Sequence, residues 1–282
     1  MPSPQVNYIN SFDDDRERKL IKSTDFPRTR YSLAADLQRL GLSAGNTVIV
    51  HSSLRSLGWV NGGAVAYIQA LQDAVTENGT IVMPTQSANY TDPGGWRHPK
   101  VPAEWVEEVR AMMPAFDPRL TPTRRMGAVP ELFRTWPGAV RSSHPSASFA
   151  AWGRRAEEIV AEHGPKRIGE QSPAGALYRL DGLVALIGVG FDRNTCFHLA
   201  EYRSPTSTYV TELMPLVANG RVRWTEVEEV EFMDEATLRR LGADFEATGG
   251  VKTGRVGSAE ARLFRARDCV DFAVDWLARA RS

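Results

Sequence analysis

The sequence predicts an α/β fold in which a mixed β-sheet is flanked by helices, in an arrangement close to three layers. Two apolar runs typical of strands, 47–50 and 80–83, are separated by a helical pattern over about 64–75. Such a strand–helix–strand unit favours parallel strands joined by a right-handed crossover. A third apolar run, 183–190, ends in glycines and leads into another helical segment, as expected of a buried strand.

The first 28 residues are mostly polar, which predicts a loose leader. The rest of the chain, 29–282, shows no internal repeat and no clear shift in composition, so we expect one domain. Near its start, Ser32 is expected to cap a helix that ends at Gly41. In the helix over 64–75, one face is expected to be buried: Val65, Ile68, Leu71 and Ala74.

The middle of the chain, 86–122, is rich in proline, glycine and aromatic residues, which predicts long loops with a helix near 103–112. Residues 209–233 alternate in the manner of antiparallel strands and contain a turn signal at Asn219-Gly220. Further helices are predicted over three segments: 126–136, 156–162 and 268–280.

Composition excludes several functional classes. Lys+Arg and Asp+Glu both total 34, and this zero net charge gives no sign of a nucleic-acid or membrane partner, because both need a basic excess. The two cysteines are too few for a disulfide framework and show no zinc-binding spacing. We see no signal peptide and no apolar run of about 20 residues. A reduced, cytoplasmic protein is therefore expected.

The most informative segment follows the strand over 183–190. Asp192 or Asn194 can cap a helix that carries His198 and Glu201. Their i, i+3 spacing places both side chains on one helix face, where the carboxylate can hold the imidazole for general-base chemistry. On local sequence alone, a solvated pair on an exposed helix face is the favoured interpretation.

The loop after the first strand is a candidate ligand site, since loops at the carboxyl ends of strands in α/β sheets often bind ligands. It contains hydroxyls, free amides and a cation, in the run His51, Ser52, Ser53, Leu54 and Arg55. An ordinary polar connection is the alternative. The loop is not a Walker A motif, and the chain lacks the GxGxxG dinucleotide fingerprint.

Three further residues have both a functional and a structural interpretation. His144 precedes Pro145 and so lies in an extended or turn segment, where it could be catalytic, bind a ligand or brace a loop. Ser172 is predicted to cap a helix that opens with Pro173, and the amides there could meet an anion. Cys196 lies two residues from His198, a spacing that argues against a thiol nucleophile. No grouping has metal-ligand spacing, so we predict no metal site.

Taken in order, these pieces resemble the aminoglycoside 3-N-acetyltransferase family, the antibiotic N-acetyltransferases. The resemblance covers roughly residues 30–279. It rests on these segments: His51-Ser52-Ser53-Leu54, Val82-Met83-Pro84, Pro114-Ala115-Phe116-Asp117-Pro118, Arg141-Ser142 with His144-Pro145, Ser172-Pro173, Gly188-Val189-Gly190 with Asp192 and Asn194-Thr195, His198-Leu199-Ala200-Glu201, Val256-Gly257 and Arg262-Leu263.

The resemblance implies acetyl transfer from acetyl-coenzyme A to the 3-amino group of a 2-deoxystreptamine aminoglycoside, on a fold that is distinct from the GNAT acetyltransferases. It implies His198 as the catalytic base and Glu201 as its partner. The segment from His51 to Arg55, together with Ser172, matches regions that hold coenzyme A.

Because an aminoglycoside is a polycation, its site should be acidic. Candidate acceptor-binding residues are Asp92, Asp117, Glu226, Glu228 and His144, with Glu229 beside them. A solvated strand edge is the alternative for the glutamates. Other functions also remain open: acetyl transfer to a different, biosynthetic amine, or sequestration of a ligand without turnover. The oligomeric state is open as well, with a homodimer as one option.

Overall fold

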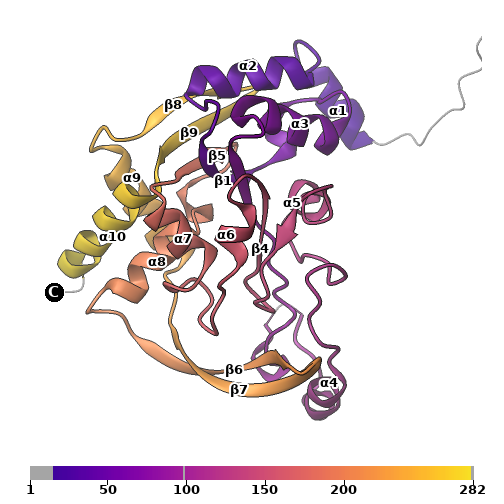
Figure 1. The fold of residues 1–282 in the computed structure, drawn as a ribbon, viewed down its shortest axis with the longest axis vertical. Coiled ribbons are helices and arrows are strands. Elements are labelled where there is room, and N and C mark those ends of the chain that lie inside the picture. Colours follow the sequence, from indigo (N-terminus) through magenta and orange to yellow (C-terminus); the bar gives the residue numbers. More distant parts are fainter. Residues whose placement is uncertain (1–14, 98, 281–282) are drawn as a thin grey trace, which may run out of the picture.

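The computed structural model describes residues 15–97 and 99–280. Its centre is a seven-stranded mixed sheet with strands in the order β3-β4-β2-β1-β5-β9-β8 (Figure 1). These strands span the following residues: β1 Thr47–Ser52, β2 Thr80–Pro84, β3 Val140–Arg141, β4 Phe149–Gly153, β5 Leu183–Ile187, β8 Lys252–Val256 and β9 Ala259–Arg265. The predicted α/β class with a mixed sheet is confirmed.

The helices flank the sheet (Figure 1). They span the following residues: α1 Asp15–Ser23, α2 Arg30–Leu40, α3 Gly63–Val75, α4 Val106–Met112, α5 Ala128–Phe133, α6 Ala156–Val160, α7 Pro173–Arg179, α8 Cys196–Arg203, α9 Glu235–Glu246 and α10 Ala266–Ala280. Short 3₁₀ turns lie at η1 Leu54–Leu57, η2 Pro93–Gly95, η3 Ala103–Trp105 and η4 Phe191–Arg193. Within the described residues, no helix has the length and apolar character that crossing a membrane requires.

The central strands are parallel: β1 pairs with β2 on one side and with β5 on the other. Helix α3 connects β1 to β2, as the predicted strand–helix–strand unit requires. The outer strands β4, β9 and β8 are antiparallel to their neighbours. The sequence analysis did not predict these outer strands, because β4 is rich in alanine and β8 is polar and exposed.

Strand residues alternate between two apolar cores, one on each face of the sheet. Val48 and Val50 lie in the core that α2, α3 and α5 cover. Ile49 and Val184 lie in the core that α6, α7, α8, α9 and α10 cover. The three-layer arrangement follows from this alternation, because a strand that is buried on both faces needs helices on both sides.

A two-stranded hairpin, β6 Tyr209–Ala218 and β7 Arg221–Val230, stands apart from the main sheet. The predicted turn is confirmed: Asn219 and Gly220 join the strands with positive φ angles of 51° and 71°. The hairpin arches away from the sheet toward α4 (Figure 1). There the indole N–H of Trp224 donates to the carbonyl oxygen of Arg110, at 3.0 Å.

Several predicted details need correction. The cap of α2 is Thr29, not Ser32; Ser32 is the third helical residue and completes a capping box with Thr29. Val65 on α3 is 44% exposed and lies outside the buried face. Before α8 the chain forms the 3₁₀ turn η4, and Asn194 rather than Asp192 accepts the first helical amide, from Cys196, at 3.1 Å.

The described part of the predicted leader contains helix α1 and a segment that contacts the main body of the chain. The Thr24 hydroxyl accepts the amide of Trp59 at 2.8 Å, and Arg28 forms a short parallel bridge with Val60. These contacts hold the end of the leader against the loop that follows β1. Residues 1–14 lie outside the described part of the chain.

Close packing of α9 on the core depends on Gly242. A Cβ added at this position would lie 2.1 Å from Cγ of Phe191. We therefore expect Gly242→Ala to lower the free energy of unfolding by about 2–3 kcal/mol in urea denaturation, because an overpacked core must shift. Gly250→Ala is the matched control, since its added Cβ would meet only the Thr248 hydroxyl, at 3.6 Å. Equal stability of the two variants would contradict this account.

Candidate active site

His198 and Glu201 lie on α8, which begins beyond the carboxyl end of the parallel strand β5. One turn of helix separates them, and Nδ1 of His198 lies 2.7 Å from Oε2 of Glu201. The Glu201 side chain is fully buried, whereas the His198 side chain is 16% exposed. The predicted pairing is therefore present, with the acid inside the protein and the imidazole at the surface of a cavity.

The bonds of Glu201 determine the tautomer of the histidine. Its other oxygen, Oε1, accepts the backbone amide of Met233 at 2.6 Å. A carboxylate offers only acceptors, so the hydrogen of the short His198 contact is on Nδ1. Nε2 of His198 is then the nitrogen with a free lone pair, as a general base requires.

The ring of Phe232 stacks on His198, with 4.2 Å between ring centroids. A cavity of about 240 Å³ opens beside them. We call it the catalytic cavity; its lining residues are Gln86, Ala88, Thr91, Ser146, Ala147, Arg167, Ile168, His198 and Phe232. The described lining contains no carboxylate, so its only permanent charge is that of Arg167.

Arg167 and Phe232 were not predicted as site residues. The guanidinium of Arg167 lies 5.6 Å from the Phe232 ring centroid and forms an ion pair with Glu212 of the hairpin. The Arg167 amide donates to Glu229 at 3.0 Å, and Glu229 also accepts the hydroxyl of Tyr202. No local motif marks these residues, because the folded hairpin brings them to His198 from distant parts of the chain.

His51 lies at the end of β1, beside the catalytic helix. Its Nε2 is 3.1 Å from the hydroxyl of Thr195, the residue before α8. Burial, with a smaller effect from the nearby His198, lowers the pKa of His51 to about 3. His51 is therefore neutral at physiological pH, and it ties β1 to the start of α8.

The other predicted donor-binding residues do not line the catalytic cavity. Ser52 ends β1, Leu54 and Arg55 form part of η1, and the Ser53 hydroxyl caps this turn by accepting the amide of Ser56. Ser172 is buried and caps α7 by accepting the amide of Gly175, which confirms the predicted cap. Binding of coenzyme A by these residues remains a prediction.

The predicted acceptor-binding carboxylates are dispersed. Asp92 is paired with Arg110 at 2.7 Å, and Asp117 is paired with Arg119 at 3.5 Å. On the hairpin, Glu226 and Glu228 are exposed and share one face of β7. The alternating face carries Glu229, whose carboxylate contacts Arg167 and Tyr202. None of these five predicted carboxylates lines the catalytic cavity.

The bonds of His144 indicate the loop-bracing role among its three interpretations. Its Nδ1 accepts the amides of Ser146 and Ala147 at 3.3 and 3.1 Å, and Nε2 is 3.1 Å from the carbonyl oxygen of Pro165. It is 2% exposed and lies behind the cavity wall that Ser146 and Ala147 form. Both ring nitrogens are thus bonded to the backbone.

Neither a reactive thiol nor a metal cluster accompanies the histidine. Burial raises the pKa of Cys196 to about 12, so this group is a thiol at neutral pH and not a thiolate. Among the described residues, no group of three or more His, Cys, Asp or Glu side chains is arranged to hold a metal ion.

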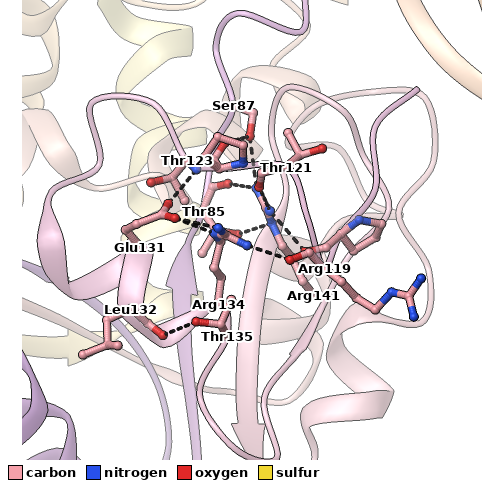
Figure 2. A network of polar contacts seen from close by, with 12 residues as sticks. Thr85, Ser87, Arg119, Thr121, Thr123, Glu131, Leu132, Arg134, Thr135 and Arg141 are labelled. Atoms are coloured by element: carbon pink, nitrogen blue, oxygen red, sulfur yellow. Dashed lines mark hydrogen bonds and ion pairs between the residues drawn. The ribbon is translucent and has the colours of Figure 1, made fainter. Parts of the chain in front are cut away.

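Arg141 organises the long segment that reaches the cavity (Figure 2). This buried guanidinium donates to Thr85, Ser87, Pro118, Thr121 and Ser148, at 2.5–3.2 Å. Burial lowers its pKa to about 10, which leaves it charged at neutral pH. Because Thr85 and Ser87 flank Gln86, these bonds fix the backbone on both sides of a residue that lines the catalytic cavity.

A histidine held by a buried carboxylate at the wall of a cavity, beyond the end of a parallel strand, is typical of enzymes that use acid–base chemistry. The chain belongs to the aminoglycoside 3-N-acetyltransferase family, whose sequence profile matches residues 49–278. It is 50% identical to the SPbeta prophage-derived aminoglycoside N(3')-acetyltransferase-like protein YokD of Bacillus subtilis (strain 168), over 92% of this chain and 96% of that relative. It is 35% identical to aminoglycoside N(3)-acetyltransferase VII of Streptomyces paromomycinus, over 93% and 95%. The predicted family and the acyltransferase class are confirmed.

Solved structures share the fold. The crystal structure of YokD from Bacillus subtilis superposes with a TM-score of 0.90 at 49% identity, covering 93% of this chain and 97% of that one. The structure of AAC-IIIb in binary complex with CoASH superposes with a TM-score of 0.80 at 31% identity, covering 91% of this chain and 98% of that one. The structure of AAC-VIa bound to sisomicin superposes with a TM-score of 0.79 at 31% identity, covering 91% of this chain and 100% of that one.

The buried histidines make stability depend on pH. Burial lowers the pKa of His144 to about 3 and that of His163 to about 4, against about 6.5 in the unfolded chain. Below pH 6.5 the unfolded state binds more protons, so stability is lost as the pH falls from 6.5 toward 4. Between pH 6 and 4.5, we expect the free energy of unfolding of the His163→Gln variant to fall by about 1.4 kcal/mol less per pH unit than that of the wild type. Urea denaturation across this range measures the free energy of unfolding at each pH. If it falls equally steeply with pH in both proteins, His163 does not have the lowered pKa.

The Arg141 interactions require a guanidinium. We expect Arg141→Lys to lower the free energy of unfolding by about 3 kcal/mol or more, because an ammonium cannot reach all of these acceptors and each one left buried and unpaired costs about 1–3 kcal/mol. Cleavage within 86–124 in limited proteolysis should also accelerate. Arg119→Lys is the control, since that side chain is 87% exposed. Wild-type stability for Arg141→Lys would show that the interactions contribute little.

Proposed function

We propose that this protein transfers the acetyl group of acetyl-coenzyme A to the 3-amino group of an aminoglycoside, with His198 as general base. The observation that carries the proposal is the 2.7 Å contact between His198 and the buried Glu201 at the wall of a cavity. The family assignment supports it, as do the relatives named for CoASH and for sisomicin complexes. The reaction would take place in the cytoplasm.

The base is needed because an aminoglycoside amine is largely protonated at neutral pH, and an ammonium has no lone pair with which to attack. One proton is lost to solvent when the amine binds. As the nitrogen attacks the thioester carbonyl, Nε2 of His198 takes a second proton, the C–N bond forms and the C–S bond then breaks. The imidazolium returns its proton to the departing thiolate, which leaves as the free thiol of coenzyme A.

Glu201 would stabilise the imidazolium that forms during the reaction and hold its ring in place. Its position between His198 and the Met233 amide allows little movement. A direct transfer between two bound substrates needs no acyl-enzyme, and the buried neutral thiol of Cys196 is not suited to form one.

The tetrahedral intermediate needs hydrogen-bond donors for its oxyanion. The amides after His51 and at the start of α8 are candidate donors. Three of them already have partners: Ser53 donates to Ile187, Asn194 to Phe191 and Cys196 to the Asn194 side chain. The oxyanion would therefore be bound by the other backbone amides of these two segments.

We expect His198→Ala to lower kcat by about 10²–10⁴-fold while acetyl-coenzyme A still binds, because general-base catalysis contributes about this much. Thiol release with kanamycin measures the rate, and mass spectrometry of the product locates the acetyl group. Cys196→Ala, a change on the same helix, is the control and should lose little activity.

Two results would sink the proposal. A His198→Ala variant with near wild-type kcat would assign the base elsewhere, and His144 would be a poor substitute because both its ring nitrogens are bonded to the backbone. An acetyl-thioester isolated on the protein would refute direct transfer.

A further inference from the structure

A second cavity, of about 430 Å³, adjoins the catalytic cavity, and Ala88 and Thr91 line both. Three arginines line the second cavity, Arg97, Arg124 and Arg125, together with the indole of Trp96. We call it the arginine pocket. Since the two cavities share part of their walls, a molecule that places an amine at His198 can extend into the arginine pocket.

In the described part of the chain, two of the three arginines of the arginine pocket lack an ion pair. The described lining of the pocket contains no carboxylate. Arg97 and Arg124 form no ion pair within the described residues, whereas Arg110 and Arg119, from the same stretch of chain, are paired with Asp92 and Asp117. A cleft lined by charges of one sign concentrates its field and attracts ions of the opposite sign.

Hydrogen bonds hold two parts of the arginine pocket's wall in place. The Arg124 amide donates to the carbonyl oxygen of Gln86, at 2.9 Å, which attaches this wall to the catalytic cavity. The indole N–H of Trp96 donates to the Thr91 hydroxyl at 3.0 Å, so the ring is held in position. Arg125 has a φ angle of 60°, a left-handed conformation that is costly for a residue with a Cβ.

The described lining of the catalytic cavity also lacks a carboxylate, and its one arginine, Arg167, is paired with Glu212 of the hairpin. Arginine is the side chain best suited to bind phosphate oxygens, through paired N–H donors. An aromatic face such as Trp96 complements a sugar ring. We propose that the arginine pocket binds a phosphate group of the acceptor, which makes the preferred substrate an aminoglycoside or related amino sugar that carries a phosphate ester.

This inference rests on the proposed function, because it takes the amine at His198 to belong to the acceptor. The donor is expected at the loop that follows β1, and no residue of 53–63 lines either cavity. The arginine pocket is therefore assigned to the acceptor and not to the phosphates of coenzyme A.

The test compares kanamycin with kanamycin 3′-phosphate as acceptors in the thiol-release assay. We expect the wild type to show a kcat/KM at least 10-fold higher for the phosphorylated acceptor. The double variant Arg97→Gln/Arg124→Gln should lose this preference, with a fall of about 10- to 100-fold for the phosphorylated acceptor, since each charged hydrogen bond contributes about 10-fold or more. The control Arg119→Gln changes an exposed arginine outside both cavities and should keep the preference.

The remaining outcomes separate the explanations. Equal or better turnover of unphosphorylated kanamycin by the wild type would overturn the inference and leave the proposed function intact. A double variant whose KM rises for acetyl-coenzyme A but not for S-acetylpantetheine would place the donor's phosphates in the pocket, which also overturns it. If neither acceptor gives thiol release that depends on His198, the proposed function fails. Calorimetric binding of pyrophosphate, weakened by the double variant and not by Arg119→Gln, would then still support an anion site, and its absence would refute one.

Discussion

The site depends on one buried carboxylate. Burying an ionised carboxyl group is costly unless both its oxygens are bonded, and Glu201 meets this condition through His198 on one side and the Met233 amide on the other. The second bond ties α8 to the segment that follows the hairpin. The same carboxylate therefore orients the imidazole and holds Phe232, the neighbour of Met233, against the imidazole face.

The sequence was sufficient to predict those elements that short-range contacts along the chain determine. Residues within a few positions of one another form the Ser172 cap, the Asn219-Gly220 turn and the His198/Glu201 pair. The strand–helix–strand unit follows from the apolar pattern of one continuous stretch of chain. Arg167 and Phe232 lie 31 and 34 residues from His198 in sequence, on segments that meet only in the folded protein. Edge strand β8 was missed for a related reason: it is polar, and it pairs only because β9 lies beside it.

Charge was harder to predict than structure, because a carboxylate's partner is invisible in the sequence. Asp92 and Asp117 indicated an acidic acceptor site, yet each lies beside an arginine in the fold. His144 left three interpretations open until its two backbone-bonded nitrogens indicated a brace. In each case the residue type was informative, and the contacts made in the folded chain decided what the residue does.

The arginines and the family assignment place opposite demands on the acceptor. A base at His198 needs an amine, and the relatives named for aminoglycosides act on or bind polycations. Arg97 and Arg124 have no ion pair within the described residues and the described linings contain no carboxylate, so this part of the site repels a polycation. The exposed Glu226 and Glu228 lie on the hairpin face opposite Glu229 and so do not offset this charge at the cavity wall. A phosphate on the amino sugar resolves the conflict, since it supplies the anion that the arginines need and leaves the amine free for His198.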